Sequence, residues 1–176
     1  VLRYTRTTTD SFPMNAVHET TESSSTDTVY NDLVLVIQSE MDMTEVGTLP
    51  GKTEGSAPIT QTSRSFTLKT SNMVYDSKGL LLSFVRTTTE DSDPSTAEKK
   101  VSVETVAGQT YDKGHLVSSS TQTLETVGET MVRSYQNNVL STKYNLLGQA
   151  IEQVRERLEL GKRTTERIAL MEYNSS

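Results

Sequence analysis

Two histidines are the residues of this sequence with the clearest potential for catalysis. His18 lies in an expected polar loop, and His115 directly follows an expected turn glycine. Serine and glutamate are so abundant that neither histidine has a Ser or carboxylate neighbour beyond what chance provides. We therefore expect solvated histidine side chains, no catalytic residues and no enzymatic activity.

Clustered acids are the second group that could do chemistry. The stretch TTEDSDP places Glu90, Asp91 and Asp93 close together. Hard cations such as Ca²⁺ bind several oxygen ligands, so these three are weak candidates for metal ligands. Their spacing follows neither the EF-hand nor the nonapeptide pattern, and the stretch EMDMTE (40–45) has the same character. We expect solvated acidic loops, with no metal and no cofactor.

The composition points to an extended, strand-rich object. Of the 176 residues only 33% are hydrophobic, there is no Trp, and Ser and Thr number 21 and 28. Thr, Val and Tyr favour pleated, half-buried strands. We expect an all-β fold with a narrow core and much hydrated surface.

Charge and hydropathy exclude several classes of partner. The net charge is -6, so the chain lacks the basic surface typical of nucleic-acid binding. No apolar run approaches the ~18–20 residues of a membrane span. Without cysteine, disulfides, Cys-ligated zinc and thiol catalysis are excluded. The composition fits an exported bacterial or archaeal surface protein and also a cytosolic one.

A short motif recurs along the chain. Its pattern is Tyr, then Asp or Asn, one or two free residues, Gly, and an alternating apolar stretch; the tyrosines are 45, 36, 33 and 29 residues apart. The residues to which we assign turn or packing roles are Tyr30, Tyr75, Asp76, Gly79, Tyr111, Asp112, Gly114, Tyr144, Asn145, Gly148 and Tyr173. We expect the tyrosines to pack as a stack with their hydroxyls in solvent.

The motif has the chemistry of a hairpin turn. Asp or Asn at the first position accepts a hydrogen bond from the backbone two residues on, and Gly supplies the left-handed conformation after a type I turn. The connector at 31–33 lacks that Gly. At their other ends the strands meet polar loops that contain all four prolines, and a further loop is expected at the pair 137–138.

These patterns predict tandem antiparallel β-hairpins. The expected units are 1–33, 34–79, 80–114, 115–148 and 149–176, which together form one repeat array as an elongated sheet, a rod or a solenoid. The last unit also fits two short helices around Gly161, because Ile151, Val154 and Leu158 have helical spacing; the repeat register favours a hairpin there.

A longer match supports the register. LRYTRTTTDS (2–11) parallels LSFVRTTTED (82–91), so that Arg6 matches Arg86 and Tyr4 matches Phe84. In the second copy this stretch directly follows a connector, and the final YNSS matches the start of one. The sequence therefore predicts that the chain is a segment of a longer array.

The Tyr-Asp-x-x-Gly-x-Leu pattern resembles the YD repeats of Rhs-type proteins and the tandem arrays of very large bacterial surface proteins. This resemblance implies hairpins that form long sheets, often as a shell around a toxin. Rhs repeats are shorter and often have Arg after the Gly, where this chain has Leu80, His115 and Gln149. A rod or filament therefore suits the spacing better than a closed shell.

The expected function is a structural segment of an extracellular filament, adhesin stalk or surface coat. Its partners would be neighbouring repeats or copies of itself, since exposed strand edges self-associate, with glycans as further candidate partners. Two alternatives stay open: an Rhs-like encapsulating shell, and a carbohydrate-binding or β-helix enzyme scaffold.

Overall fold

The computed structural model describes residues 5–11, 17–24, 26, 28–49, 59–90 and 98–169. All four prolines lie outside these ranges, as do Tyr4, Asp91, Asp93 and Tyr173. The described residues form strands and turns with no helix, which confirms the all-β prediction. The strands are β1 (Thr5–Ser11), β2 (Val17–Ser24), β3 (Val29–Tyr30), β4 (Val36–Leu49), β5 (Ile59–Tyr75), β6 (Leu81–Glu90), β7 (Lys100–Asp112), β8 (His115–Val127), β9 (Thr130–Tyr144), β10 (Ala150–Glu159) and β11 (Lys162–Ala169).

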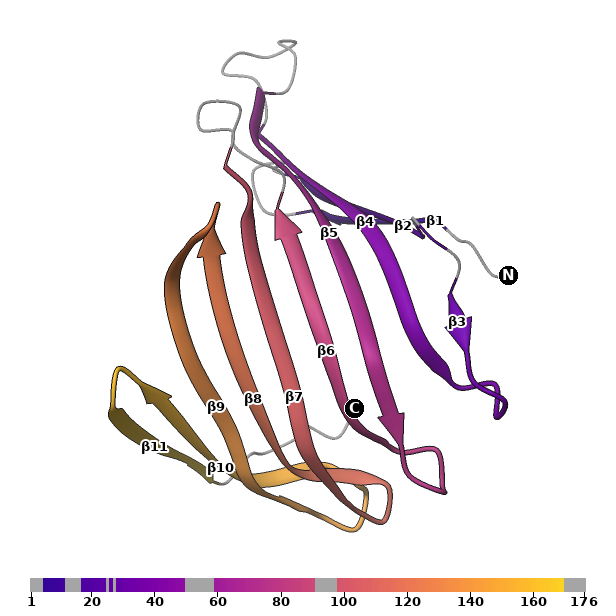
Figure 1. The fold of residues 1–176 in the computed structure, drawn as a ribbon, viewed down its shortest axis with the longest axis vertical. Coiled ribbons are helices and arrows are strands. Elements are labelled where there is room, and N and C mark those ends of the chain that lie inside the picture. The colour runs from indigo at the N-terminus through magenta and orange to yellow at the C-terminus, as the bar shows by residue number, and fades with distance from the viewer. Residues whose placement is uncertain are drawn as a thin grey trace. The chain divides into compact units, whose positions relative to one another are not determined.

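The strands follow each other in the sheet in chain order. The path runs β1-β2-β4-β5-β6-β7-β8-β9-β10-β11, antiparallel throughout, with the short β3 paired to β4 beside it (Figure 1). Such a meander needs only local connections, which is what tandem hairpins provide. The prediction of tandem antiparallel hairpins is therefore confirmed.

Contacts between Cα atoms divide the chain into two units. The first contains 1–70 and 87–101, and the second contains 71–86 and 102–176. The first unit holds the hairpin β1–β2 and the pairing of β4 with β2 and β5. The second holds the pairings β8–β9, β9–β10 and β10–β11.

Very little of the described chain is fully buried. Val106 is the single buried hydrophobic side chain among the described residues, and Thr70, Thr123 and Thr142 are buried as well. Most strand residues are half-buried, as the low hydrophobic content predicts. Stability therefore comes mainly from the hydrogen-bonded ladder and from cross-strand side-chain pairs.

The last unit is a hairpin. β10 and β11 pair from Glu159↔Lys162 to Glu152↔Ala169 around the turn at Leu160 and Gly161. Both turn residues have positive φ, 50° and 77°, which is the backbone of a type I′ turn. The helical alternative is therefore wrong, because this turn reverses the chain after a strand-length segment.

The turn expected at Asn137 and Asn138 is also wrong. Both residues lie inside β9, and the chain reverses earlier, at Gly128 and Glu129 between β8 and β9. Gly128 has φ 57°, a conformation that glycine adopts without strain. In mid-strand, Asn138 instead donates a hydrogen bond from Nδ2 to Glu156 Oε1, at 3.1 Å.

Candidate functional site

Three connectors between hairpins share one hydrogen-bond pattern. In each, the Asx side-chain oxygen accepts hydrogen bonds from the backbone N–H groups two and four residues on. For Asp76 the donors are Lys78 (2.8 Å) and Leu80 (2.9 Å). For Asn145 they are Leu147 (2.9 Å) and Gln149 (3.0 Å). One carboxylate or amide oxygen thus satisfies two backbone donors at a strand end.

The connector without glycine has the same geometry. Asn31 Oδ1 accepts from the N–H groups of Leu33 and Leu35, both at 3.0 Å. Val34 stands where Gly79 and Gly148 stand in the other two, and its φ is 61°. A β-branched residue in this region is strained, so the Asx hydrogen bonds impose the turn even without the favourable glycine.

The shorter connector turns by a different backbone conformation. Lys113 and Gly114 lie between Asp112 and His115, with φ 50° and 86°. Two positive values at the central residues define a type I′ hairpin turn. The one-residue difference in the motif therefore changes the turn type, while the tyrosine stays at the end of the preceding strand.

Two of the connector tyrosines donate a hydrogen bond to the backbone of the strand that opens their own unit. Tyr111 donates its hydroxyl to the carbonyl of Leu81, and Tyr144 donates to the carbonyl of Leu116, both at 2.6 Å. Leu81 lies two residues after Gly79, and Leu116 lies two residues after Gly114. The expectation that these hydroxyls reach solvent is thus wrong for Tyr111 and Tyr144.

Burial and charge affect the tyrosine pKa values. Burial raises the pKa of Tyr111 above its ordinary value of 10.0, and the negative charge of Asp76 raises it further. Burial also raises the pKa of Tyr75. Both phenols are therefore neutral hydrogen-bond donors at physiological pH. Tyr30 is 37% exposed at the end of β3.

His115 belongs to this tyrosine cluster. Its ring stacks on Tyr144, with centroids 4.8 Å apart and planes at 27°. Gly148 lies directly against the imidazole, since a Cβ atom there would be 2.7 Å from His115 Cε1. His115 thus packs on the following connector. The loop expected at His18 is wrong, because His18 is half-buried in β2 and paired opposite Asp10 of β1.

A second set of contacts consists of arginine side chains over aromatic rings. Arg64 lies over Phe66 at 4.9 Å and Arg86 lies over Phe84 at 5.2 Å, measured from the guanidinium carbon to the ring centroid. Arg86 also approaches Glu104, at 3.8 Å. Cation–π contacts of this kind contribute roughly 0.5–1 kcal/mol at exposed positions.

Tyr135 lies between two arginines. Arg133 is 5.0 Å and Arg157 is 4.4 Å from its ring centroid. Glu159, the cross-strand partner of Tyr135, accepts hydrogen bonds from both guanidinium groups. The hydrogen bond from Arg133, assisted by its charge, lowers the pKa of the Glu159 carboxyl, and Arg157 adds to the effect. Sequence reasoning missed this cluster, whose only local signal is an arginine two residues from an aromatic.

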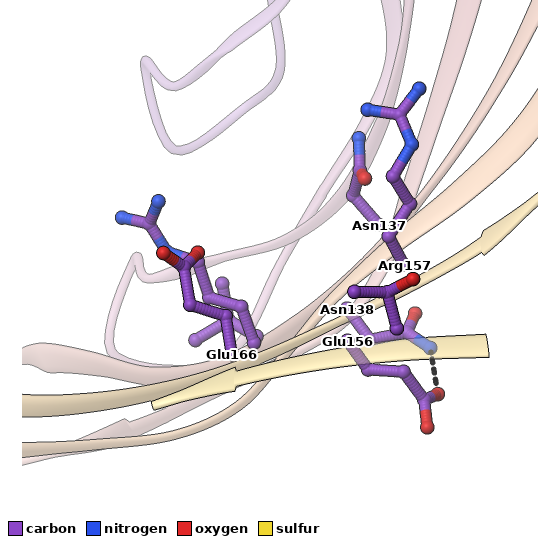
Figure 2. A pocket seen from close by; sticks show the side chains of 8 residues that line it. Asn137, Asn138, Glu156, Arg157 and Glu166 are labelled. Atoms are coloured by element: carbon purple, nitrogen blue, oxygen red, sulfur yellow. Dashed lines mark hydrogen bonds between the residues drawn. The ribbon is translucent and has the colours of Figure 1, made fainter. Parts of the chain in front are cut away.

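Strands β9, β10 and β11 form a polar pocket beside this cluster. Its volume is about 490 Å³, and Figure 2 shows Asn137 and Arg157 on one side of the strands and the hydrogen-bonded Asn138 and Glu156 on the other. Thr164 and Glu166 of β11 complete the lining. The pocket is lined by hydrogen-bonding groups of both charges, and Val139 is the one apolar residue in its lining.

The acidic stretch at 90–93 has a structural contact at its described end. Glu90 binds Arg64 Nε at 2.6 Å, and Asp91 and Asp93 lie outside the described residues. Across the described part of the chain, no group of three His, Cys, Asp or Glu side chains could hold a metal ion. The described residues also contain no helix that is long and apolar enough to cross a bilayer.

Comparisons with known proteins give no relative for this chain. No family model, no curated protein and no solved structure matches it.

Proposed function

We propose that this chain is a structural repeat segment of an extracellular filament, adhesin stalk or surface coat, which joins neighbouring repeats or copies of itself through strand edges. The observation that carries the proposal is the sheet itself. Ten strands follow one another in chain order, three of the described connectors share the same Asx turn, and Val106 is the only buried hydrophobic residue among those described. Such a sheet gains stability from neighbours, because stacked or paired repeats bury what one unit leaves exposed.

The edges and turns support association. Among the described strands, β1 and β11 each have one neighbour, and an unpaired strand edge is a template for another chain. At a connector tip, the side chains of Leu146 and Leu147 are 103% and 82% exposed. Exposed apolar groups of this size favour a covering partner.

The resemblance to YD repeats belongs to this proposal. Its support is the Asx turn that three connectors share. Two tyrosines add to this support, because each lies near the end of its unit and donates a hydrogen bond to the first strand of that unit. The proposal places the protein at the cell surface. Protease treatment of intact cells, followed by detection of this chain, tests that location; full protection of the chain would contradict it.

Sedimentation velocity and electron microscopy test the self-association. At micromolar concentrations we expect species larger than a monomer whose proportion rises with concentration, and rod-like particles in micrographs. A monodisperse, compact monomer across the same range would contradict the proposal.

A further inference from the structure

The two edges of the sheet differ in charge. β1, β2 and β4 together carry six acidic residues and one arginine, a net charge of -5. β9, β10 and β11 carry seven basic residues and four glutamates, a net charge of +3. In a chain with a net charge of -6, the positive charge is thus concentrated at the edge formed by β11.

Several of these charges have no partner of their own. Within the described part of the chain, the side chains of Asp10 and Glu19 near the β1 edge and of Lys162 at the β11 edge make no hydrogen bond or ion pair. Arg163 and Arg167 bind Glu156 and Glu152 at 3.0 and 3.1 Å, and their side chains stay 67% and 65% exposed. Both edges therefore present charge to an approaching strand.

Strand direction allows the two edges to meet. The path contains ten strands, each antiparallel to the next, so β1 and β11 have opposite sense in the strand order of the sheet. If β11 of one copy lies beside β1 of another, the new pair is antiparallel like the others. Pairing β11 with β11 instead sets Lys162, Arg163 and Arg167 of two copies against each other, which is unfavourable.

We propose that copies of this chain associate head to tail, with the basic β11 edge of one copy paired to the acidic β1 edge of the next. The partner is a second copy, selected by charge complementarity, and the contact is heterologous, so assembly is open-ended unless the rotation closes a ring. This inference rests on the proposed function and adds the polarity of assembly, which is the edge by which each copy joins the next. The competing arrangement is a two-fold β1–β1 pair in which Arg6 faces Asp10 of the other copy, and such a pair stops at a dimer.

Paired charge reversals test the polarity. The first variant is Lys162→Glu with Arg167→Glu, and the second is Asp10→Lys with Glu19→Lys. Counted over the two outermost strands of each edge, the first variant changes the charge of β10 and β11 from +1 to -3, and the second changes the charge of β1 and β2 from -2 to +2. Each variant alone therefore has like charges at both edges, so we expect its association constant to fall about tenfold or more. An equimolar mixture restores opposite charges at every junction, and we expect assembly to return.

The control variant is Lys78→Glu with Lys113→Glu. It makes the same change in net charge as the first variant, at exposed turn positions, and should assemble like the natural sequence. Far-UV circular dichroism verifies that all variants fold. Sedimentation is measured at low and high salt, and the natural assembly should weaken as salt screens the edges. The polarity is wrong if the single variants assemble normally, if salt has no effect, or if growth stops at dimers. If the natural chain never associates, the proposed function fails with it.

Discussion

At the scale of single residues, Val34 shows that the connector is set by its Asx residue. Its φ of 61° places a β-branched side chain where L-residues lose roughly 1–2 kcal/mol. The two hydrogen bonds to Asn31 Oδ1 hold it there. The turn therefore forms although a valine stands where two other connectors have glycine. A substitution that removes the backbone strain at this position should stabilise the protein.

Val34→Gly should stabilise the protein. We expect the free energy of unfolding to rise by about 1 kcal/mol, because glycine adopts positive φ without steric cost. Urea unfolding followed by circular dichroism measures the change. The control is Val36→Gly, two residues on in β4, where the same substitution should destabilise. Loss of stability in both variants would show that Val34 is not strained.

The tyrosine hydroxyl is the second feature at this scale. Tyr111→Phe removes the hydrogen bond to the Leu81 carbonyl and leaves a part-buried acceptor unpaired, so we expect a loss of about 1 kcal/mol in unfolding free energy. Tyr30→Phe serves as the control, since Tyr30 is 37% exposed and has no hydrogen bond from its hydroxyl within the described part of the chain. Equal effects in the two variants would assign the loss to something other than this bond.

At the scale of elements, β9, β10 and β11 are joined by ion pairs that cross the strands. Glu152 receives hydrogen bonds from Lys143 and Arg167, both at 3.1 Å. The lysine bond, followed by that of the arginine, lowers the pKa of Glu152 below its ordinary value of 4.5. Glu159 is lowered in the same direction, chiefly by Arg133.

These carboxylates should make stability fall in acid. A carboxyl whose pKa is lower in the folded state stabilises the fold above its unfolded pKa, and this contribution is lost as pH falls from about 4.5 through the lowered value. We expect the urea midpoint to decrease over that range, and Glu152→Gln with Glu159→Gln to flatten the decrease. Glu166→Gln, at a glutamate without an ion pair among the described residues, should leave it intact. An unchanged pH dependence in the double variant would contradict this account.

The sequence predicts an element well when the contacts that form it lie between residues close together in the chain. Asp76 with Gly79 and Asn145 with Gly148 predict their turns, because each turn is made by bonds within five residues. Asn137 and Asn138 suggested a turn from residue type alone, whereas pairing with β8 and β10 keeps them in β9. The outcome at this pair was thus set by partners distant in sequence.

The arginine clusters lay beyond sequence reasoning for the same reason. Arg133 and Glu159 are 26 residues apart, and their contact depends on the β9–β10 register, which includes irregularities at Ala150/Glu152 and Val154/Arg155. The sequence match between Arg6 and Arg86 partly indicated that arginines have a recurring structural role. Arg86 of β6 approaches Glu104 of β7 at 3.8 Å, and Arg6 of β1 binds Glu22 of β2 at 3.0 Å, so the repeated arginine makes a cross-strand contact at both places.

At the scale of the whole molecule, the scarcity of buried apolar side chains has a thermodynamic consequence. Unfolding of a globular protein raises the heat capacity by about 12–15 cal/mol/K per residue, mainly because apolar surface becomes hydrated. Here Val106 alone is a buried hydrophobic residue among those described, and most other strand side chains are only half-buried. The protein therefore has less apolar surface to expose than a globular chain of equal length.

We expect a heat-capacity change of unfolding per residue below the globular range. Differential scanning calorimetry at low protein concentration and raised salt, where edge association is suppressed, measures it. As concentration rises, association should increase the midpoint temperature by mass action. A heat-capacity change in the globular range for the monomer would mean that its apolar side chains are covered in solution. The sheet would then have a core of its own, and the stability argument for assembly through neighbouring repeats would fail.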